Sequence, residues 1–449
     1  MTGPSDSNAR PEPPPAAAPE SLAERRRRSA QRRRLRRIAT TAAAAVAAIA
    51  GAGWATLSSD RLPAPSAPSG VRSVRSSPPP RVEQRQLEAL SAPLSGAAGA
   101  VVGGKLVLGG GLTAATASVA NVYAHAGSGL LSPALSSVPP RIYVPESGSN
   151  TVAVIDPATY TVIDRFAVGA QPQHITPSYD LKTLYVLNNQ GNSVTPLDPL
   201  TGRPRSPLPV TDPYNLYFTP GGRYSIVVAE AKARLDFRDP HTFHRQRSLP
   251  VPCRGIDHLD FTADGRFLLA SCEFSGQLVV VDVRRQTVIK TLALGRGTAM
   301  PQDVKLAPDG RVFYVADMRR GGLWIVTADT FRVSGFLPTG KGAHGLYPSR
   351  DARVLYVSNR GEGTVSVVDF AARRIVATWL IPGGSPDMGG VSANGRVLWL
   401  TGRYNGEVYA IDTRTGHLLA RISVGRGPHG LAVWPQPGRY SLGHTGLMR

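Results

Sequence analysis

A repeat of about 43 residues constrains this chain more than any other feature of its sequence. Its clearest copy, from Arg353 to Asp369, has a strand-like stretch, a Gly-bearing turn and a Val-rich stretch ending in Asp. A unit this short cannot bury its own apolar face, so the copies must stack on one another, and this period is typical of four-stranded propeller blades. The residues that end the second stretch of each copy, spaced 41–45 apart, are Asp156, Asp198, Asp239, Asp282, Thr327, Asp369 and Asp412.

The first and last copies predict how the blades close into a ring. The first copy begins at Arg141 without an innermost strand, and the last one ends with an additional innermost strand at 429–434. The C-terminal strand can therefore complete the blade begun by residues 141–168, which leaves no free sheet edge at the seam. The sequence predicts an all-β fold: a seven-bladed β-propeller at 141–434, followed by a C-terminal tail at 435–449.

The aspartates that end the repeats are expected to be structural. Asp156-Pro157 and Asp198-Pro199 are typical of turns, in which the Asp side chain bonds back to the backbone and Pro presets φ. Asp264-Gly265 is typical of a hairpin turn that needs a positive φ.

The residues before the propeller predict export. The net charge of the chain is +20, and residues 1–82 carry fourteen Arg against five acids. We expect residues 1–37 to be a basic cytoplasmic tail and 38–59, which are uncharged, to be a signal anchor or a cleaved signal peptide, since a span needs about 20 residues and Arg-rich flanks stay in the cytoplasm. The propeller would then be extracytoplasmic, either on a single-pass cell-membrane protein or secreted.

Two further segments separate this membrane or signal segment from the propeller. Residues 60–82 are rich in Pro and Ser and predict a disordered linker, whereas the Ala/Gly-rich residues 83–140 are expected to pack irregularly against the globular part. The basic N-terminus could also bind nucleic acid, but export argues against nucleic acid as a partner.

Several repeats share a Tyr-Val motif ending in Asn or Asp. Tyr185-Val-Leu-Asn188, Tyr314-Val-Ala-Asp317 and Tyr356-Val-Ser-Asn359 are each followed by a turn and a strand-like stretch. This pattern resembles the YVTN repeat of seven-bladed bacterial propellers, which implies an exported or surface protein. Distant relatives include the d1-haem domain of cytochrome cd1 nitrite reductase and the N-terminal domain of nitrous oxide reductase. The chain has no Cys-x-x-Cys-His haem motif, so no catalytic residue of those enzymes can be placed here.

Polar residues recur at the start of the innermost strands. Four of the nine histidines and three aspartates fall at this position of the repeat. Because the chain reverses at every turn, all these strand starts lie on one face of a propeller, around the mouth of its channel. The candidate ligand-binding residues at this mouth are His174, Asn215, Asp257, His258, Asp303, His344, Asp387 and His429.

These residues allow three interpretations. They could line a hydrated channel and bond to strand ends, form a small-ligand or cofactor site, or hold a metal ion, which needs imidazole nitrogens about 2.0–2.1 Å from it. The sequence identifies neither the cofactor nor the metal. It also leaves open which face His444 would cover, and places His241, His244 and His417 in outer strands as surface residues.

Arginines gather in the loops of the later blades on the same face. Guanidinium groups pair with carboxylates and phosphates, so an anionic ligand is one hypothesis and an ordinary solvated surface is the other. The candidate anion-binding residues are Arg319, Arg320, Arg360 and Arg403.

The two cysteines fall in one predicted blade. Cys253 precedes an innermost strand and Cys272 ends the next one, with the strand register setting Cys272 opposite Asp257. Outside the cytoplasm such a pair favours a disulfide, with free thiols or soft metal ligands as alternatives.

No nucleophile, base and acid occur at a motif spacing, so the sequence assigns no catalytic residue. The favoured hypothesis is a tethered or secreted binding module whose partner is an unidentified protein or a small, anionic molecule. The rival is an oxidoreductase-like propeller with a tetrapyrrole or metal at the histidines, and a lactonase-like hydrolase is a weaker variant.

Overall fold

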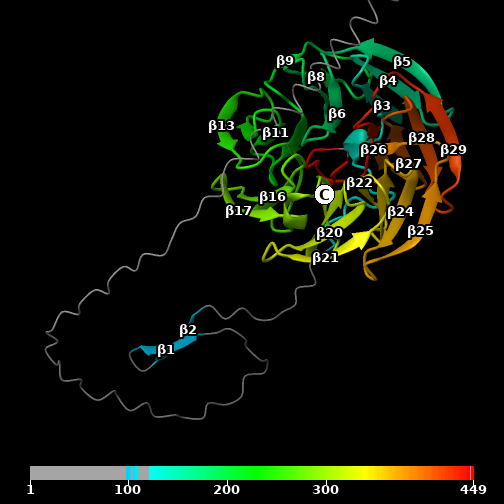
Figure 1. Ribbon diagram of the computed structural model, residues 1–449. Coiled ribbons are helices and arrows are strands. Elements are labelled where there is room, and N and C mark those ends of the chain that lie inside the picture. Colours follow the sequence, from blue (N-terminus) through cyan, green and yellow to red (C-terminus); the bar gives the residue numbers. More distant parts are fainter. Residues whose placement is uncertain (1–97, 103–104, 110–120, 445) are drawn as a thin grey trace, which may run out of the picture. The chain divides into compact units, whose positions relative to one another are not determined.

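The computed structural model describes residues 98–102, 105–109, 121–444 and 446–449. In this part of the chain, seven four-stranded antiparallel sheets surround one axis (Figure 1). The predicted seven-bladed β-propeller is confirmed. The innermost strands, in blade order from the seam, are β30 (Ala432–Trp434), β6 (Pro172–Pro177), β10 (Asn215–Phe218), β14 (Ile256–Phe261), β18 (Pro301–Leu306), β22 (Ala343–Pro348) and β26 (Pro386–Val391).

The other three strands of each blade follow outward in chain order. The second strands are β3 (Arg141–Glu146), β7 (Leu184–Asn188), β11 (Ser225–Ala229), β15 (Phe267–Cys272), β19 (Val312–Asp317), β23 (Val354–Asn359) and β27 (Val397–Gly402). The third strands are β4 (Thr151–Asp156), β8 (Ser193–Leu197), β12 (Arg234–Arg238), β16 (Gln277–Asp282), β20 (Gly322–Thr327), β24 (Thr364–Asp369) and β28 (Glu407–Asp412). The outer strands are β5 (Thr161–Ala167), β9 (Leu208–Pro209), β13 (Arg245–Pro250), β17 (Thr287–Ala293), β21 (Val333–Pro338), β25 (Arg374–Leu380) and β29 (Leu418–Ser423).

The ring of blades closes as predicted from the first repeat, which lacks an innermost strand, and from the additional strand after the last repeat. Strand β30 pairs with β3, so that Arg141 lies opposite Trp434 and Tyr143 opposite Ala432. The seam blade thus combines one strand from the C-terminal end of the propeller with three from its beginning.

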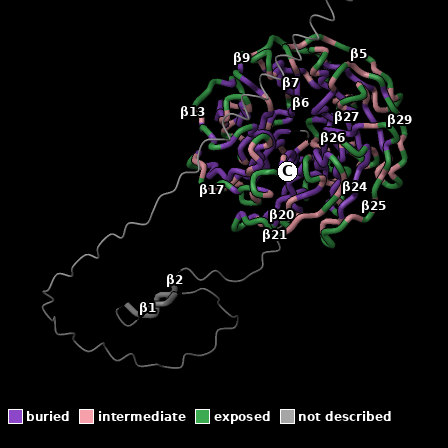
Figure 2. The backbone as a smooth tube through the Cα atoms, viewed as in Figure 1, coloured by how far each residue is buried: buried purple, intermediate pink, exposed green. Residues whose placement is uncertain are grey.

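The core lies between neighbouring blades. Buried residues fill the inner and middle strands, while exposed residues line the rim (Figure 2). Tyr314 of β19, for example, packs in one cluster with Leu346 and Val357 of the next blade. Each blade therefore buries its apolar faces against its two neighbours, which is how stacked repeats gain their stability.

The aspartates at the ends of the third strands form turns. Asp156 accepts a hydrogen bond from the backbone N–H of Ala158 at 2.8 Å, and Asp239 and Asp412 each accept two backbone N–H groups of the following turn. These bonds hold the pKa values of Asp239 and Asp412 below the usual range. In the hairpin after β14, Gly265 has φ +68°, which side chains with a Cβ rarely adopt.

The segment before the propeller contains some regular structure. Strands β1 (Ala98–Val102) and β2 (Lys105–Gly109) pair as an antiparallel hairpin, and a 3-10 turn, η1, covers Pro133–Leu135. Tyr123, Ala126 and Leu135 are buried in the same cluster as residues of the seam blade. A second 3-10 turn, η2 (Gly295–Gly297), follows β17.

The predicted cytoplasmic tail, membrane or signal segment and linker (1–82) lie outside the described residues. Within the described ranges, no helix has the length and apolar character needed to cross a membrane.

The C-terminal tail runs back alongside β10. The N–H of Phe218 donates to the carbonyl of Leu442 at 2.9 Å, and the N–H of His444 donates to the carbonyl of Leu216 at 3.0 Å. Leu442 and Leu447 are buried with β10 and β14 residues. The tail therefore runs along β10 from the end of this strand toward its start and places His444 in the channel.

Candidate metal centre

Local irregularities at the inner strands bring the polar residues into the channel. In β14, Ile256 pairs with Cys272 and Leu259 with Ala270, so β14 has one residue more than its partner at Asp257-His258. Such a β-bulge bends the strand and re-aims its side chains. The other inner strands with a register shift at this position are β6, β18, β22 and β26.

Five histidines meet inside the channel. Four are those predicted at the strand starts, and each is at most 2% exposed. The ring centroid of His174 lies 5.4 Å from that of His258 and 4.8 Å from that of His429, and His344 lies 5.7 Å from His429. The predicted mouth histidines are thus brought together, as neighbours around the axis.

The fifth histidine, His444, comes from the C-terminal tail. It is fully buried, with ring centroids 4.4 Å from that of His258 and 5.1 Å from that of His174. Its Nδ1 lies 3.2 Å from Nδ2 of Asn215, and its Nε2 lies 3.7 Å from Oδ1 of Asp303. The open question about its position is therefore answered: it lies inside the channel, beside the other histidines.

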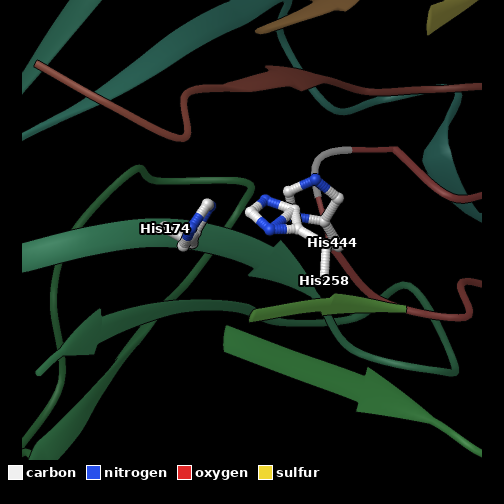
Figure 3. A group of neighbouring side chains, drawn as sticks. All are labelled: His174, His258 and His444. Carbon is white, nitrogen blue, oxygen red and sulfur yellow. The ribbon is translucent and has the colours of Figure 1, made fainter. Parts of the chain in front are cut away.

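Three of these imidazoles form a group with metal-site spacing. One nitrogen from each of His174, His258 and His444 lies within 4.8 Å of the other two. Figure 3 shows the three rings gathered, with His444 on the C-terminal segment. In the described part of the chain, neither ring nitrogen of His174 has a hydrogen-bond partner, although an unpaired buried polar group costs about 1–3 kcal/mol. We call these three residues the histidine triad.

A glycine makes room for one member of the triad. His174 forms an isolated bridge with Gly430 of the seam blade, and a Cβ at position 430 would collide with the His174 imidazole. Any other residue would displace the ring.

Buried carboxylates surround the histidines. Oδ1 of Asp257 lies 2.6 Å from Nδ1 of His258, and its Oδ2 has no hydrogen-bond partner in the described residues. Asp303 accepts the backbone N–H groups of Val304 and Leu346, both at 2.9 Å. Asp303 also lies 3.9 Å from Nζ of the buried Lys305, so the negative charge of Asp257 is the one that would offset a bound cation. A carboxylate bonded to a ligating imidazole fixes the orientation of the ring.

The electrostatics keep two members of the triad neutral. Burial, then the neighbouring histidines, lower the pKa of His174 well below its usual value, and burial followed by His258 lowers the pKa of His444 to about 3. Burial also disfavours the charged form of His258, but Asp257 and Asp303 outweigh it and raise its pKa. Neutral imidazole is the form that binds metals.

The remaining two histidines bind protein groups instead. Oδ2 of Asp387 lies 2.7 Å from Nδ1 of His429, and Oδ1 lies 3.1 Å from Nδ1 of His344. Burial and then the charge of Arg360 or Arg403 lower the pKa of both imidazoles. Neither of them belongs to the group whose nitrogens lie within 4.8 Å of one another, which is the reason for separating them from the triad.

The four predicted anion-binding arginines make different contacts. Arg360 donates from Nε and Nη2 to Oδ1 of Asp387 and is nearly buried. Arg319 donates to the carbonyl of Thr298 at 3.1 Å, and Arg320 stacks over the rings of Trp324 and Phe336. Only Arg403 extends over the seam, where Nη1 lies 3.3 Å from Oγ of Ser147 and from the carbonyl of Gly427.

The two cysteines form a disulfide, with an S–S distance of 2.07 Å. The bulge changes the expected register, because Ile256 rather than Asp257 lies opposite Cys272. The disulfide holds the segment immediately before Asp257 and His258 against β15.

Comparison with known proteins gives the chain a family. A family model described as a YNCE-like beta-propeller matches residues 108–437. The chain belongs to this family. Among curated proteins, no sequence matches this YNCE-like propeller.

Solved structures match the fold of this YNCE-like propeller at low sequence identity. Kuenenia stuttgartiensis hydrazine synthase is 18% identical, with a TM-score of 0.54, over 63% of this chain and 95% of that one. The dihydro-heme d1 dehydrogenase NirN is 16% identical, with a TM-score of 0.52, over 66% and 75%. A 6-phosphogluconolactonase homologue from Bacteroides uniformis is 15% identical, with a TM-score of 0.53, over 66% and 99%. At these identities the matches establish the fold alone.

A pair of carboxyls borders the mouth of this YNCE-like propeller beside Tyr214. Glu230 and Glu273 hydrogen-bond to each other, and Glu273 also accepts from Nε2 of Gln302 at 2.9 Å. Burial, then the charge of Asp257, raise the pKa of Glu230 to about 9. Glu230 therefore keeps its proton at neutral pH and donates it to Glu273.

Glu230→Gln is expected to stabilise the protein at pH 8. In the folded state Glu230 keeps its proton up to a pH of about 9, whereas in the unfolded state it loses this proton above about pH 4.5. The free energy of unfolding therefore falls as the pH rises from about 4.5 to 9. Glutamine keeps the donor without this penalty, and we expect a gain of about 1–3 kcal/mol at pH 8 and little at pH 5. Urea unfolding at both pH values measures it, with exposed Asp164→Asn as control; an equal effect at both pH values contradicts the assignment.

Proposed function

We propose that this YNCE-like propeller is an exported metal-binding module, which holds a transition-metal ion such as Zn²⁺ in its channel through His174, His258 and His444. The observation that carries the proposal is the group of three buried imidazoles with nitrogens within 4.8 Å of one another. Zn²⁺ accepts imidazole nitrogens at about 2.0–2.1 Å, so small movements of the rings would complete the coordination.

The state of His174 is compatible with a role as a metal ligand. In a channel lined by protein hydrogen bonds alone, each buried imidazole would have a protein partner, whereas both nitrogens of His174 lack one among the described residues. A metal ion would satisfy one nitrogen. The adjacent Asp257 would balance part of its charge, as buried charges require, whereas Asp303 already lies 3.9 Å from Nζ of the buried Lys305.

Three protein ligands would leave one coordination position for an exogenous group. Catalytic zinc sites keep such an open position, whereas structural sites fill all four with protein atoms. The site therefore suits a metal that binds a small molecule, and the hypothesis of a small-ligand module and that of a metal-dependent propeller converge on one channel.

Export is part of the proposal. The disulfide between Cys253 and Cys272 supports it, because such bonds persist outside the reducing cytoplasm. A tethered or secreted module would meet its ligand, or a partner protein, in that compartment.

The test is a titration of the full chain with Zn²⁺ after chelator treatment, in competition with a chromophoric chelator. We expect one equivalent bound with a Kd of about 1 μM or below, since structural imidazole and thiolate sites reach well beyond that. Co²⁺ should give a visible absorption spectrum typical of nitrogen coordination in a tetrahedral field.

The controls use histidines on and off the site. His174→Ala should abolish stoichiometric binding, while His244→Ala, on the exposed surface, should leave it unchanged. Circular dichroism checks that the variants are folded. Absence of stoichiometric binding by the unaltered chain, or its persistence in folded His174→Ala, would refute the proposal.

A further inference from the structure

Arg403 carries a charge that no described carboxylate balances. It follows β27, and its Nη1 lies near two neutral acceptors, Oγ of Ser147 and the carbonyl of Gly427. Within residues 121–444 and 446–449, no acidic group lies within ion-pair distance of it. Arg360, at the corresponding place one blade earlier, is instead neutralised by Asp387. A guanidinium with spare donors and an unbalanced charge is a ready partner for an anion.

The contacts of Arg403 place it over two of the mouth histidines. Ser147 donates to the carbonyl of Pro172 at 2.9 Å, at the start of the strand that carries His174. Gly427 lies two residues before His429. The rings of His174 and His429 are 4.8 Å apart, and after burial and the neighbouring histidines, the charge of Arg403 helps to lower the pKa of His174. Arg403 therefore lies near the triad.

Arg403 and the C-terminal tail approach the triad from opposite ends of the inner strands. The tail pairs with Phe218, Tyr217 and Leu216 as it advances toward the start of β10. Arg403 belongs to a loop at the strand starts. A metal ion on the triad would thus have the tail on one side and Arg403 on the other.

We infer that the open position of the proposed metal ion takes a small oxyanion, a carboxylate or inorganic phosphate, with a second oxygen accepting hydrogen bonds from Arg403. This inference rests on the proposed function. A guanidinium matches two-oxygen anions in shape and charge, and a metal ion would hold the other side of the same group. Glu230 and Glu273 together carry one negative charge rather than two, since Glu230 donates to Glu273, and this weakens their repulsion of an anion.

The experiment uses the full chain loaded with one equivalent of Co²⁺. Sodium acetate and inorganic phosphate are titrated separately while the visible spectrum is recorded. We expect a saturable change with at least one of them, and the two arms distinguish a carboxylate site from a phosphate site. Arg403→Met should weaken this anion binding about tenfold or more, in keeping with the loss of a charge-assisted pair, without changing the Co²⁺ affinity.

Two variants control for indirect effects. Arg403→Lys keeps the positive charge but lacks the paired N–H donors of the guanidinium, so it should retain part of the anion binding. Arg426→Met removes an exposed arginine of the same face and should have no effect. Co²⁺ uptake without an anion-dependent spectrum, or equal anion affinity in Arg403→Met, overturns this inference alone. Failure to take up Co²⁺ overturns the proposed function and this inference with it.

Discussion

Replacing His444 with alanine is expected to lower the affinity for Zn²⁺ by about 100-fold or more. Mutation of groups that only orient metal ligands already costs about 10–100-fold, and His444 is proposed as a ligand. Its ring lies 5.1 Å from that of His174 and 4.4 Å from that of His258, measured between centroids. Competition with a chromophoric chelator measures the change.

His444→Cys separates loss of the ligand from loss of the fold. A thiolate can bind Zn²⁺ or Co²⁺ at about 2.3 Å, so this variant should regain much of the affinity and add a sulfur-to-Co²⁺ absorption band. Equal Zn²⁺ affinity in the unaltered chain and in folded His444→Ala would show that the tail is no part of the site.

The second large effect is expected from Arg449→Met. Arg449 lies 3.0 Å from Oδ1 of Asp260 in the protein interior, and its guanidinium stacks over the ring of Tyr123. Breaking a buried ion pair by removing one partner leaves an uncompensated charge and costs about 3–5 kcal/mol. Because this pair anchors the tail, the Zn²⁺ affinity should fall as well. Urea unfolding and chelator competition measure the two effects.

A tail arginine on the surface provides the matched control. Arg439→Met removes an exposed side chain from the same tail and should change neither quantity. Asp260→Asn combined with Arg449→Met should recover part of the lost stability, since the buried charge is then absent. A stability unchanged in Arg449→Met would contradict the anchoring role of the pair.

The place of four histidines at the channel mouth could be predicted from their position in the repeat, because the geometry of the blades is periodic. His174, His258, His344 and His429 share one place in the repeat, and any propeller brings such places together. The bulges in β14 and four other inner strands were not predicted, since a bulge depends on how two strands pair in three dimensions and leaves no distinct residue pattern. Because of the bulge in β14, the residue opposite Cys272 is Ile256 rather than the expected Asp257.

The roles of individual charged residues also required the structure. Arg360 and Arg403 occupy equivalent loop positions and are indistinguishable in sequence, yet one is paired with Asp387 and the other meets only neutral acceptors. His444 lies outside the repeat, so periodicity said nothing of it. Its neighbour Gly443 has φ +106°, and a Cβ at this position would collide with the carbonyl oxygen of Leu216 in β10.

The sequence by itself determined the seven-bladed fold, its closure at the seam and the ring of polar residues at the channel. These follow from a short apolar repeat that must stack, and from strand order, which are both local properties of the chain. Only the tertiary structure decided which polar residues form a site. His444 joins His174 and His258 through a tail that folds back along β10, and such a contact between segments 186 and 270 residues apart is a matter of packing that no local pattern records.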